Sequence, residues 1–115
     1  VTSSGQELES AVDPRFGRGR YLLVVDLPER TFVAVDNRAG MNATQGAGIS
    51  AAQSVIDAGA TVLISGHCGP KAFRALKAAN VDIYLTEAGT VAEALDKYEA
   101  GELESIAGAD VDGHW

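Results

Sequence analysis

The segment Gly66-His67-Cys68-Gly69-Pro70 holds the densest set of chemically useful residues in this chain. The two glycines allow a close approach of the backbone to a ligand, and His67 and Cys68 place two soft donors between them. Cys68 is the only cysteine, which excludes an internal disulfide and any multi-cysteine metal site within one chain. In the alternative interpretation, Cys68 is a small buried hydrophobe and His67 a solvated loop residue.

A second candidate segment, Arg15-Phe16-Gly17-Arg18-Gly19-Arg20, gathers three guanidinium groups around an aromatic ring. Guanidinium groups bind oxo- or sulfido-anions through paired N–H donors. An RNA-binding interpretation is weaker, because the Arg-Gly pattern occurs once in an acidic protein. Gly46-Ala47-Gly48 resembles part of a dinucleotide-binding fingerprint, but it follows a long loop and lacks the third glycine.

Charge is distributed unevenly along the 115 residues, whose formal net charge is -7. Residues 1–14 carry three acids and no base, 15–77 carry eight bases against four acids, and 78–115 carry nine acids against Lys97 alone. The acidic total argues against nucleic-acid binding, while the positive middle is suited to an anionic ligand. In the alternative interpretation, each of these cations is an ordinary solvated surface charge.

Other function classes lack their minimum motifs. The chain has no Walker sequence, no G-x-S-x-G elbow and no H-E-x-x-H pair. Asp26 and Asp36 fall at opposite ends of a strand pair, so they do not suit a two-metal nuclease. No apolar run reaches the length of a membrane span and the start has no signal-peptide pattern, so we expect a cytoplasmic protein that contacts no membrane.

The N-terminal third predicts strands and loops. Val1–Ser3 resembles the end of a strand that is cut short at its start, and residues 5–20 are expected to form a long functional loop. Tyr21–Asp26 and Thr31–Asn37 are rich in β-formers and predict a hairpin, which the loop Arg38–Gln45 follows.

From Gly46 the pattern changes to helices alternating with buried strands. Ile49, Ala52 and Ile56 predict one face of a helix that stops at Gly59. Two buried strands are expected, over Thr61–Ser65 and Val81–Leu85. The helix between them is expected to run from Pro70 to about Ala79, with Phe73 and Leu76 facing the core. A last helix is expected to be capped by Thr90 and Glu93 and to end near Gly101, with Val91, Leu95 and Tyr98 facing inward. Residues 1–101 would then form one domain and 102–115 an acidic flexible tail.

This order predicts an α/β fold with helices on both faces of a mixed, five-stranded sheet. Ligands of such sheets bind beyond the carboxyl ends of parallel strands, where helix N-termini favour anions. The residues expected to bind the ligand are Ser3, Ser4, Arg15, Phe16, Arg18, Gly46, Gly48, Gly66, His67, Gly69 and Lys71, with Cys68 and His67 as candidate metal ligands.

Four motifs in order along the chain resemble the dinitrogenase iron-molybdenum cofactor biosynthesis family. They are Asp13-Pro14-Arg15-Phe16-Gly17-Arg18, Gly46-Ala47-Gly48-Ile49 with Ala51-Ala52-Gln53, Gly66-x-x-Gly69-Pro70-x-Ala72-Phe73, and Gly89-Thr90-Val91-x-Glu93-Ala94. The resemblance implies a ribonuclease-H-like α/β/α fold. It also implies a non-enzymatic protein that binds, carries or stores a molybdenum-containing metal–sulfur cluster, either a molybdenum–copper sulfide or a related molybdenum–iron–sulfur cluster.

Two departures from the family pattern affect how such a cluster would be held. Relatives often have histidine where this chain has Arg15, and histidine near Gln45. Both changes remove metal ligands, so we expect non-covalent, electrostatic retention by strand-end loops.

Two other functions stay open from the sequence alone. One is an interaction or regulatory domain that binds a protein partner, for example in cluster delivery, through a sheet edge or the acidic tail. The other is an enzyme acting on a small anion with Cys68 as nucleophile, which would require a thiol of depressed pKa.

Overall fold

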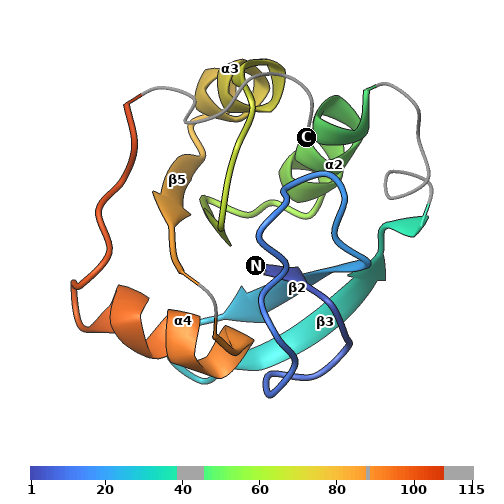
Figure 1. Ribbon diagram of the computed structural model, residues 1–115. Coiled ribbons are helices and arrows are strands. Elements are labelled where there is room, and N and C mark those ends of the chain that lie inside the picture. The colour runs from blue at the N-terminus through green and yellow to red at the C-terminus, as the bar shows by residue number, and fades with distance from the viewer. Residues whose placement is uncertain (39–45, 88, 108–115) are drawn as a thin grey trace.

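The computed structural model describes residues 1–38, 46–87 and 89–107. Figure 1 shows α2 and α3 on one side of the strands and α4 on the other. The strands are β1 (Thr2–Ser3), β2 (Tyr21–Asp26), β3 (Thr31–Asp36), β4 (Val62–Ser65) and β5 (Asp82–Leu85). The helices are α2 (Ala47–Asp57), α3 (Pro70–Ala78) and α4 (Val91–Glu99). The mixed α/β fold is therefore confirmed, with element ends close to those predicted.

The described strands form two sheets, whereas the sequence predicted one sheet of five strands. β1, β2 and β3 are antiparallel in that order, and β4 pairs with β5 in parallel. The predicted hairpin is confirmed, with Tyr21 opposite Asp36 and Asp26 opposite Thr31. β1 has only two residues and touches the second sheet through a buried hydrogen bond of 3.1 Å from the Thr2 hydroxyl to the Ser65 hydroxyl.

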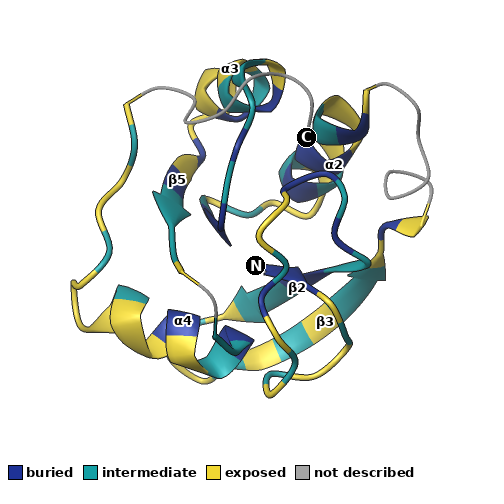
Figure 2. Ribbon diagram, in the orientation of Figure 1, coloured by how far each residue is buried: buried dark blue, intermediate teal, exposed yellow. Residues whose placement is uncertain are grey.

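Alternating strand residues pack into two apolar clusters, one on each side. Leu22 and Leu63 join α2 and α3 in the first cluster, and Leu23 and Ile64 join α4 in the second. Figure 2 shows the same division, with the helices buried toward the strands and exposed outward. Because successive strand residues point to opposite faces, β2 and β4 each supply both clusters.

The predicted inward face of α2 was wrong at Ile49, which is 47% exposed. The buried face is formed by Ala47, Ala51, Ala52 and Val55. The hydrophobicity of isoleucine favoured Ile49 in the sequence pattern. The small side chains of the alanines, however, allow α2 to pack close to its neighbours. Ile49 lies off the alanine stripe and faces outward.

The capping box predicted at the start of α4 is confirmed. The Thr90 hydroxyl accepts from the Glu93 N–H at 3.1 Å, and the Glu93 carboxylate accepts from the Thr90 N–H at 2.9 Å. The bond from the Thr90 N–H holds the pKa of Glu93 below its ordinary value. The start of α4 also lies beside the loop that follows β1, since the N–H of Val91 donates to the Ser10 carbonyl at 2.9 Å.

Part of the segment predicted as a tail returns beside β5. The Ile106 N–H donates to the Ile83 carbonyl at 2.9 Å, and Ser105 forms a single bridge with Tyr84. Leu103 and Ile106 are half-buried against the two apolar clusters. The loop predicted over 38–45 lies, except for Arg38, outside the described residues, as do residues 108–115 of the tail.

Candidate functional site

The connection from β4 to α3 is the glycine-rich segment singled out by its residue types. β4 ends at Ser65 and α3 starts at Pro70, with extended backbone at the N-cap residue Gly69. No side chain caps this helix, and its first turn contains no acid. Its first N–H groups and the positive end of its dipole therefore meet no side-chain cap and no acid of this turn, an arrangement that favours an anion.

The arginine segment lies directly against this connection. Arg15 forms a parallel bridge with His67, and the Phe16 N–H donates to the His67 carbonyl at 3.2 Å. A Cβ on Gly66 would lie 2.5 Å from the Cα of Pro14. Gly66 is thus required for the close approach of the two backbones, which brings the two predicted segments together.

The start of α2 joins them from a third direction. A Cβ on Gly17, whose φ is +99°, would lie 2.8 Å from the nitrogen of Gly48. A Cβ on Gly48 would lie 3.3 Å from the Cβ of Ala72 in α3. The N-cap of α2, Gly46, also has no side-chain cap. Two uncapped helix starts therefore flank the arginine segment.

Ser3 and Ser4, the predicted ligand-binding residues at the end of β1, form hydrogen bonds within the protein through their hydroxyl groups. The Ser3 hydroxyl donates to the Gly5 carbonyl at 2.7 Å, and the Ser4 hydroxyl donates to the Ala11 carbonyl at 3.1 Å. Ser3 is also fully buried. These serines shape the turn after β1. The Asp13 N–H donates to the Thr2 carbonyl at 3.0 Å, and the Asp13 carboxylate accepts from the Arg15 N–H at 2.9 Å, so Asp13 connects β1 to the arginine segment.

Burial divides the predicted ligand-binding residues into two groups. The Arg15 side chain is 51% exposed and Lys71 is exposed, whereas Arg18 and His67 are half-buried. Phe16 is 1% exposed and Cys68 is 0% exposed, and both belong to the apolar cluster under α2 and α3. The ring of Phe16 therefore anchors the arginine segment in the core and does not form a surface for stacking.

Neighbouring acids engage some of the cations. The Nε of Arg15 lies 3.6 Å from an oxygen of Asp13. Arg20 lies over the Tyr21 ring and pairs with Asp36 at 3.0 Å. The N–H of Arg38, followed by the Arg20 guanidinium, holds the pKa of Asp36 below its ordinary value. Arg20 is thus committed to the hairpin, while half of the Arg15 side chain still faces solvent.

One residue that sequence reasoning missed, Asn37, holds the arginine segment in place. The buried amide of Asn37 donates to the carbonyls of Gly17 and Gly19, at 3.2 and 2.9 Å. Its position directly after the hairpin strand is the only sequence signal of this role. Among the described residues, no group of three His, Cys, Asp or Glu side chains could hold a metal ion.

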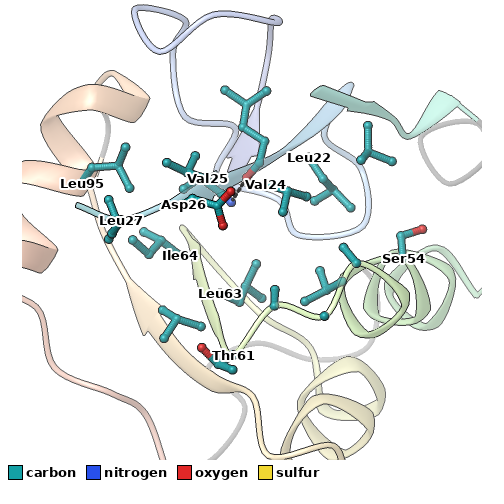
Figure 3. A pocket seen from close by; sticks show the side chains of 18 of the residues that line it. Leu22, Val24, Val25, Asp26, Leu27, Ser54, Thr61, Leu63, Ile64 and Leu95 are labelled. Carbon is teal, nitrogen blue, oxygen red and sulfur yellow. Dashed lines mark hydrogen bonds between the residues drawn. The ribbon is translucent and has the colours of Figure 1, made fainter. Parts of the chain in front are cut away.

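A pocket of about 400 Å³ lies elsewhere, between β2 and β4. Its lining is mostly aliphatic, with polar groups from Asp26, Ser54, Thr61 and Tyr98, and includes none of the predicted ligand-binding residues (Figure 3). In the part of the chain that the structure describes, no helix is long and apolar enough to cross a membrane.

Comparison with known proteins places these features in a family. Residues 1–101 match the model of a family described as dinitrogenase iron-molybdenum cofactor. The apo form of the orange protein from Desulfovibrio gigas has a similar structure, with a TM-score of 0.93, 41% identity, and coverage of 96% of this chain and 93% of that one.

Two further proteins are similar. TM1290 from Thermotoga, a candidate NifB protein of the DUF35 family, gives a TM-score of 0.84 and 34% identity over 98% of this chain and 96% of its own. An uncharacterized protein of Methanocaldococcus jannaschii, MJ0580, is 25% identical over 83% of this chain and 82% of its own.

Proposed function

Because this chain belongs to the dinitrogenase iron-molybdenum cofactor family, we propose that it binds and carries an anionic metal–sulfur cluster that contains molybdenum. The cluster is cargo, and the protein turns over no substrate. The cargo is a molybdenum–copper sulfide cluster or a related molybdenum–iron–sulfur cluster, the two kinds that the resemblance to the family implies.

The observation that carries this proposal is the meeting of three segments at one end of the fold. The arginine segment contacts both the start of α2 and the connection before α3. Both helix starts are uncapped, and the exposed cations of this region are Arg15 and Lys71. Backbone N–H groups, positive dipole ends and guanidinium groups all favour a polyanion.

The residues present fit a cluster that brings its own sulfides. Such a cluster does not need several thiolates from the protein, so a single cysteine is sufficient. We propose that Arg15, Arg18 and Lys71 supply charge and that Gly46, Gly48, Gly66 and Gly69 allow backbone contact. His67 is half-buried at the same end and is the better placed of the two candidate metal ligands. Cys68, which is fully buried, would reach the cargo only through a shift of its loop.

The proposal is tested by reconstitution. Protein mixed with tetrathiomolybdate and a copper salt is expected to leave gel filtration as a coloured complex with a fixed ratio of molybdenum and copper to protein. Metal analysis and the visible spectrum of the protein peak measure this ratio. The same mixture without protein and the same protein with molybdate are the controls. A colourless protein peak, or a metal content that rises without limit as reagent is added, would contradict the proposal.

Replacing Arg15 or Arg18 with alanine is expected to weaken cluster retention about twofold to tenfold, as loss of a partly exposed charged contact does. The deficit relative to wild type should be largest at low ionic strength and shrink as salt rises, because exposed charges are screened. Equilibrium dialysis of the coloured complex at several salt concentrations measures both effects.

Lys77→Ala is the matched control for these arginine variants. It removes the same charge from the far end of α3, where Lys77 pairs with Asp82 at 3.2 Å. If Lys77→Ala lowers retention as much as Arg15→Ala does, net charge alone holds the cluster and the site assigned to the arginine segment is wrong.

A further inference from the structure

β3 is the outer strand of the three-stranded sheet, and its far edge pairs with no other described strand. The order β1-β2-β3 places β2 on one side of β3, and Figure 1 shows β3 along the lower side of the molecule. An unpaired strand edge presents a row of N–H and carbonyl groups to which another strand can bond. β3 therefore offers backbone partners for a further strand.

The alternation of the backbone decides which groups lie at this free edge. The Asn37 N–H donates to the Arg20 carbonyl at 3.0 Å, so the backbone groups of Asn37 point toward β2. Along an antiparallel strand this direction alternates from one residue to the next. Val33 therefore bonds to β2, whereas Phe32 and Ala34 present their N–H and carbonyl groups at the free edge.

Residues 31–35 have none of the features that usually prevent an edge strand from pairing. Such features are charged side chains, proline and bulges. Residues 31–35 contain no charge and no proline, and each of them lies opposite one residue of β2 without a bulge. Val33 is 66% exposed, one of the two large apolar side chains that lie exposed in the described part of the chain. The edge therefore favours pairing with another apolar strand.

The hairpin turn at the start of β3 is acidic. The Arg30 guanidinium lies 2.6 Å from an oxygen of Asp96 and 2.7 Å from an oxygen of Glu99, both in α4. Asp26 and Glu29 belong to the same turn and add two further acids. Four acids are set against one base, which leaves this end of the strand negative.

The opposite end of β3 is basic. Arg20 and Arg38 lie 3.0 and 3.5 Å from carboxylate oxygens of Asp36. The Arg38 side chain is 64% exposed, so its charge reaches the surface. Two bases are set against one acid, which leaves this end positive. The unpaired edge thus carries opposite charges at its two ends.

Antiparallel pairing of two copies of the chain satisfies both the backbone groups and the charges. With Val33 opposite Val33 of the other copy, Phe32 faces the other copy's Ala34, and these two residues exchange both N–H···O bonds. The acidic turn of each copy then lies beside the basic end of the other. A register centred on Ala34 would instead place Arg30 opposite Arg38, and like charges disfavour it.

We propose that the free edge of β3 is a self-association surface, at which a second copy of this chain pairs antiparallel about a two-fold axis at Val33. The pairing joins two three-stranded sheets into one and gives a closed dimer. Because the contact is small, the dimer is transient, with a Kd of about 10 to 100 µM. This surface lies outside the candidate site and its pairing requires no cargo, so the cargo proposal and the dimer proposal fail independently.

Sedimentation equilibrium of the full chain, from about 10 µM to about 1 mM, measures the dimer. Val33→Lys is expected to weaken it about tenfold to hundredfold, because two lysines would face each other at the axis and two buried valines would be lost. Ile49→Lys is the matched control, since it places the same charge on an exposed aliphatic residue of α2. The control should leave the dimer unchanged.

A charge swap tests the register. Glu29→Arg and Arg38→Glu are each expected to weaken the dimer about threefold, because each disturbs two symmetry-related contacts between exposed charges. The variant with both changes should recover most of this loss, since each end then again meets an end of opposite charge. An additive loss in the double variant would contradict the antiparallel register.

Hydrogen exchange tests where the two copies meet. The N–H groups of Phe32 and Ala34 are expected to exchange about fivefold to tenfold more slowly at 1 mM than at 10 µM protein, because pairing covers them. Exchange at the Val33 N–H, which bonds to β2, should not depend on concentration. This difference between neighbouring residues is the signature of strand pairing at the free edge.

Two results would overturn the proposal. One is a monomer at every concentration, which would leave this edge to a strand of a different protein. The other is a dimer that Val33→Lys and Ile49→Lys weaken equally, with exchange at Phe32 and Ala34 independent of concentration. Such a dimer would form through another surface.

Discussion

Gly17→Ala is expected to lower the free energy of unfolding by roughly 3 to 5 kcal/mol and the Tm by roughly 10 to 20 °C. Two costs combine at this residue. Its φ of +99° is unfavourable for any L side chain, and the new Cβ would lie within 2.9 Å of the backbone of both Ala47 and Gly48. Backbone atoms at a helix start cannot move aside as a flexible side chain can.

Thermal unfolding followed by circular dichroism measures this loss, and Gly59→Ala is the control. Gly59 also has a positive φ, +76°, but a Cβ there would meet nothing within 4 Å. It should therefore cost only about 1 kcal/mol. Equal losses in the two variants would show that the contact between the arginine segment and α2 is not tight. Where Gly17→Ala still folds in the cold, its cluster retention should be lower than that of wild type.

In the chain that begins at Val1, stability is expected to rise by up to a few kcal/mol as the pH increases from about 5 to 8. The amine has a pKa of about 5 when folded and 8.0 when exposed. Between these values the unfolded state binds the additional proton, so raising the pH favours the folded state. Below about 5 the amine is protonated in both states, and the stabilisation is lost. Urea unfolding at several pH values measures this dependence.

Acetylation of Val1 is the matched control, because it replaces the amine with an amide that cannot be protonated. The acetylated chain is expected to lose this pH dependence. Asp26 and Tyr98, which line the pocket between β2 and β4 together with Val1, are present in both forms, so the comparison isolates the amine. An identical pH dependence in the acetylated and unmodified chains would show that the Val1 nitrogen is exposed to water.

Local patterns were sufficient to predict most elements of this fold. The β-rich runs around the hairpin, Pro70 at a helix start and the Thr90–Glu93 pair all act through neighbours in sequence, and each is confirmed. The face of α2 was misjudged because close packing selected alanines over Ile49. The division into two sheets was not predicted, because it depends on which strand edges pair over long sequence separations, and β1 pairs only with β2 through two residues.

The candidate site was predicted in part. The meeting of the arginine segment with the loop before α3 follows from the rule that ligand loops gather at strand ends, and the structure brings them together. Burial of Phe16 was not predicted, and burial of Cys68 was predicted only as the alternative interpretation, because a residue type does not reveal which way a loop turns. The support from Asn37 depends on contacts between residues distant in sequence.

Burial of Cys68 also bears on the alternative of an enzyme. A nucleophilic thiol must reach its substrate, and reactive cysteines are partly exposed. The side chain of Cys68 is 0% exposed, and its sulfur lies 3.7 Å from the Gly69 carbonyl. The burial of this side chain therefore argues against Cys68 as the nucleophile of an enzyme.

The segments that meet at the candidate site are separated by long stretches of chain, with Pro14 lying against Gly66 and Gly17 against Gly48. An unfolded chain does not bring them together, so cargo would bind almost only to the folded state. By thermodynamic linkage, cargo at a hundred times its Kd would then stabilise the protein by about 2.7 kcal/mol. Proteases that cleave transiently unfolded chains would therefore remove empty molecules before loaded ones, and the cellular lifetime of this protein would report its cargo.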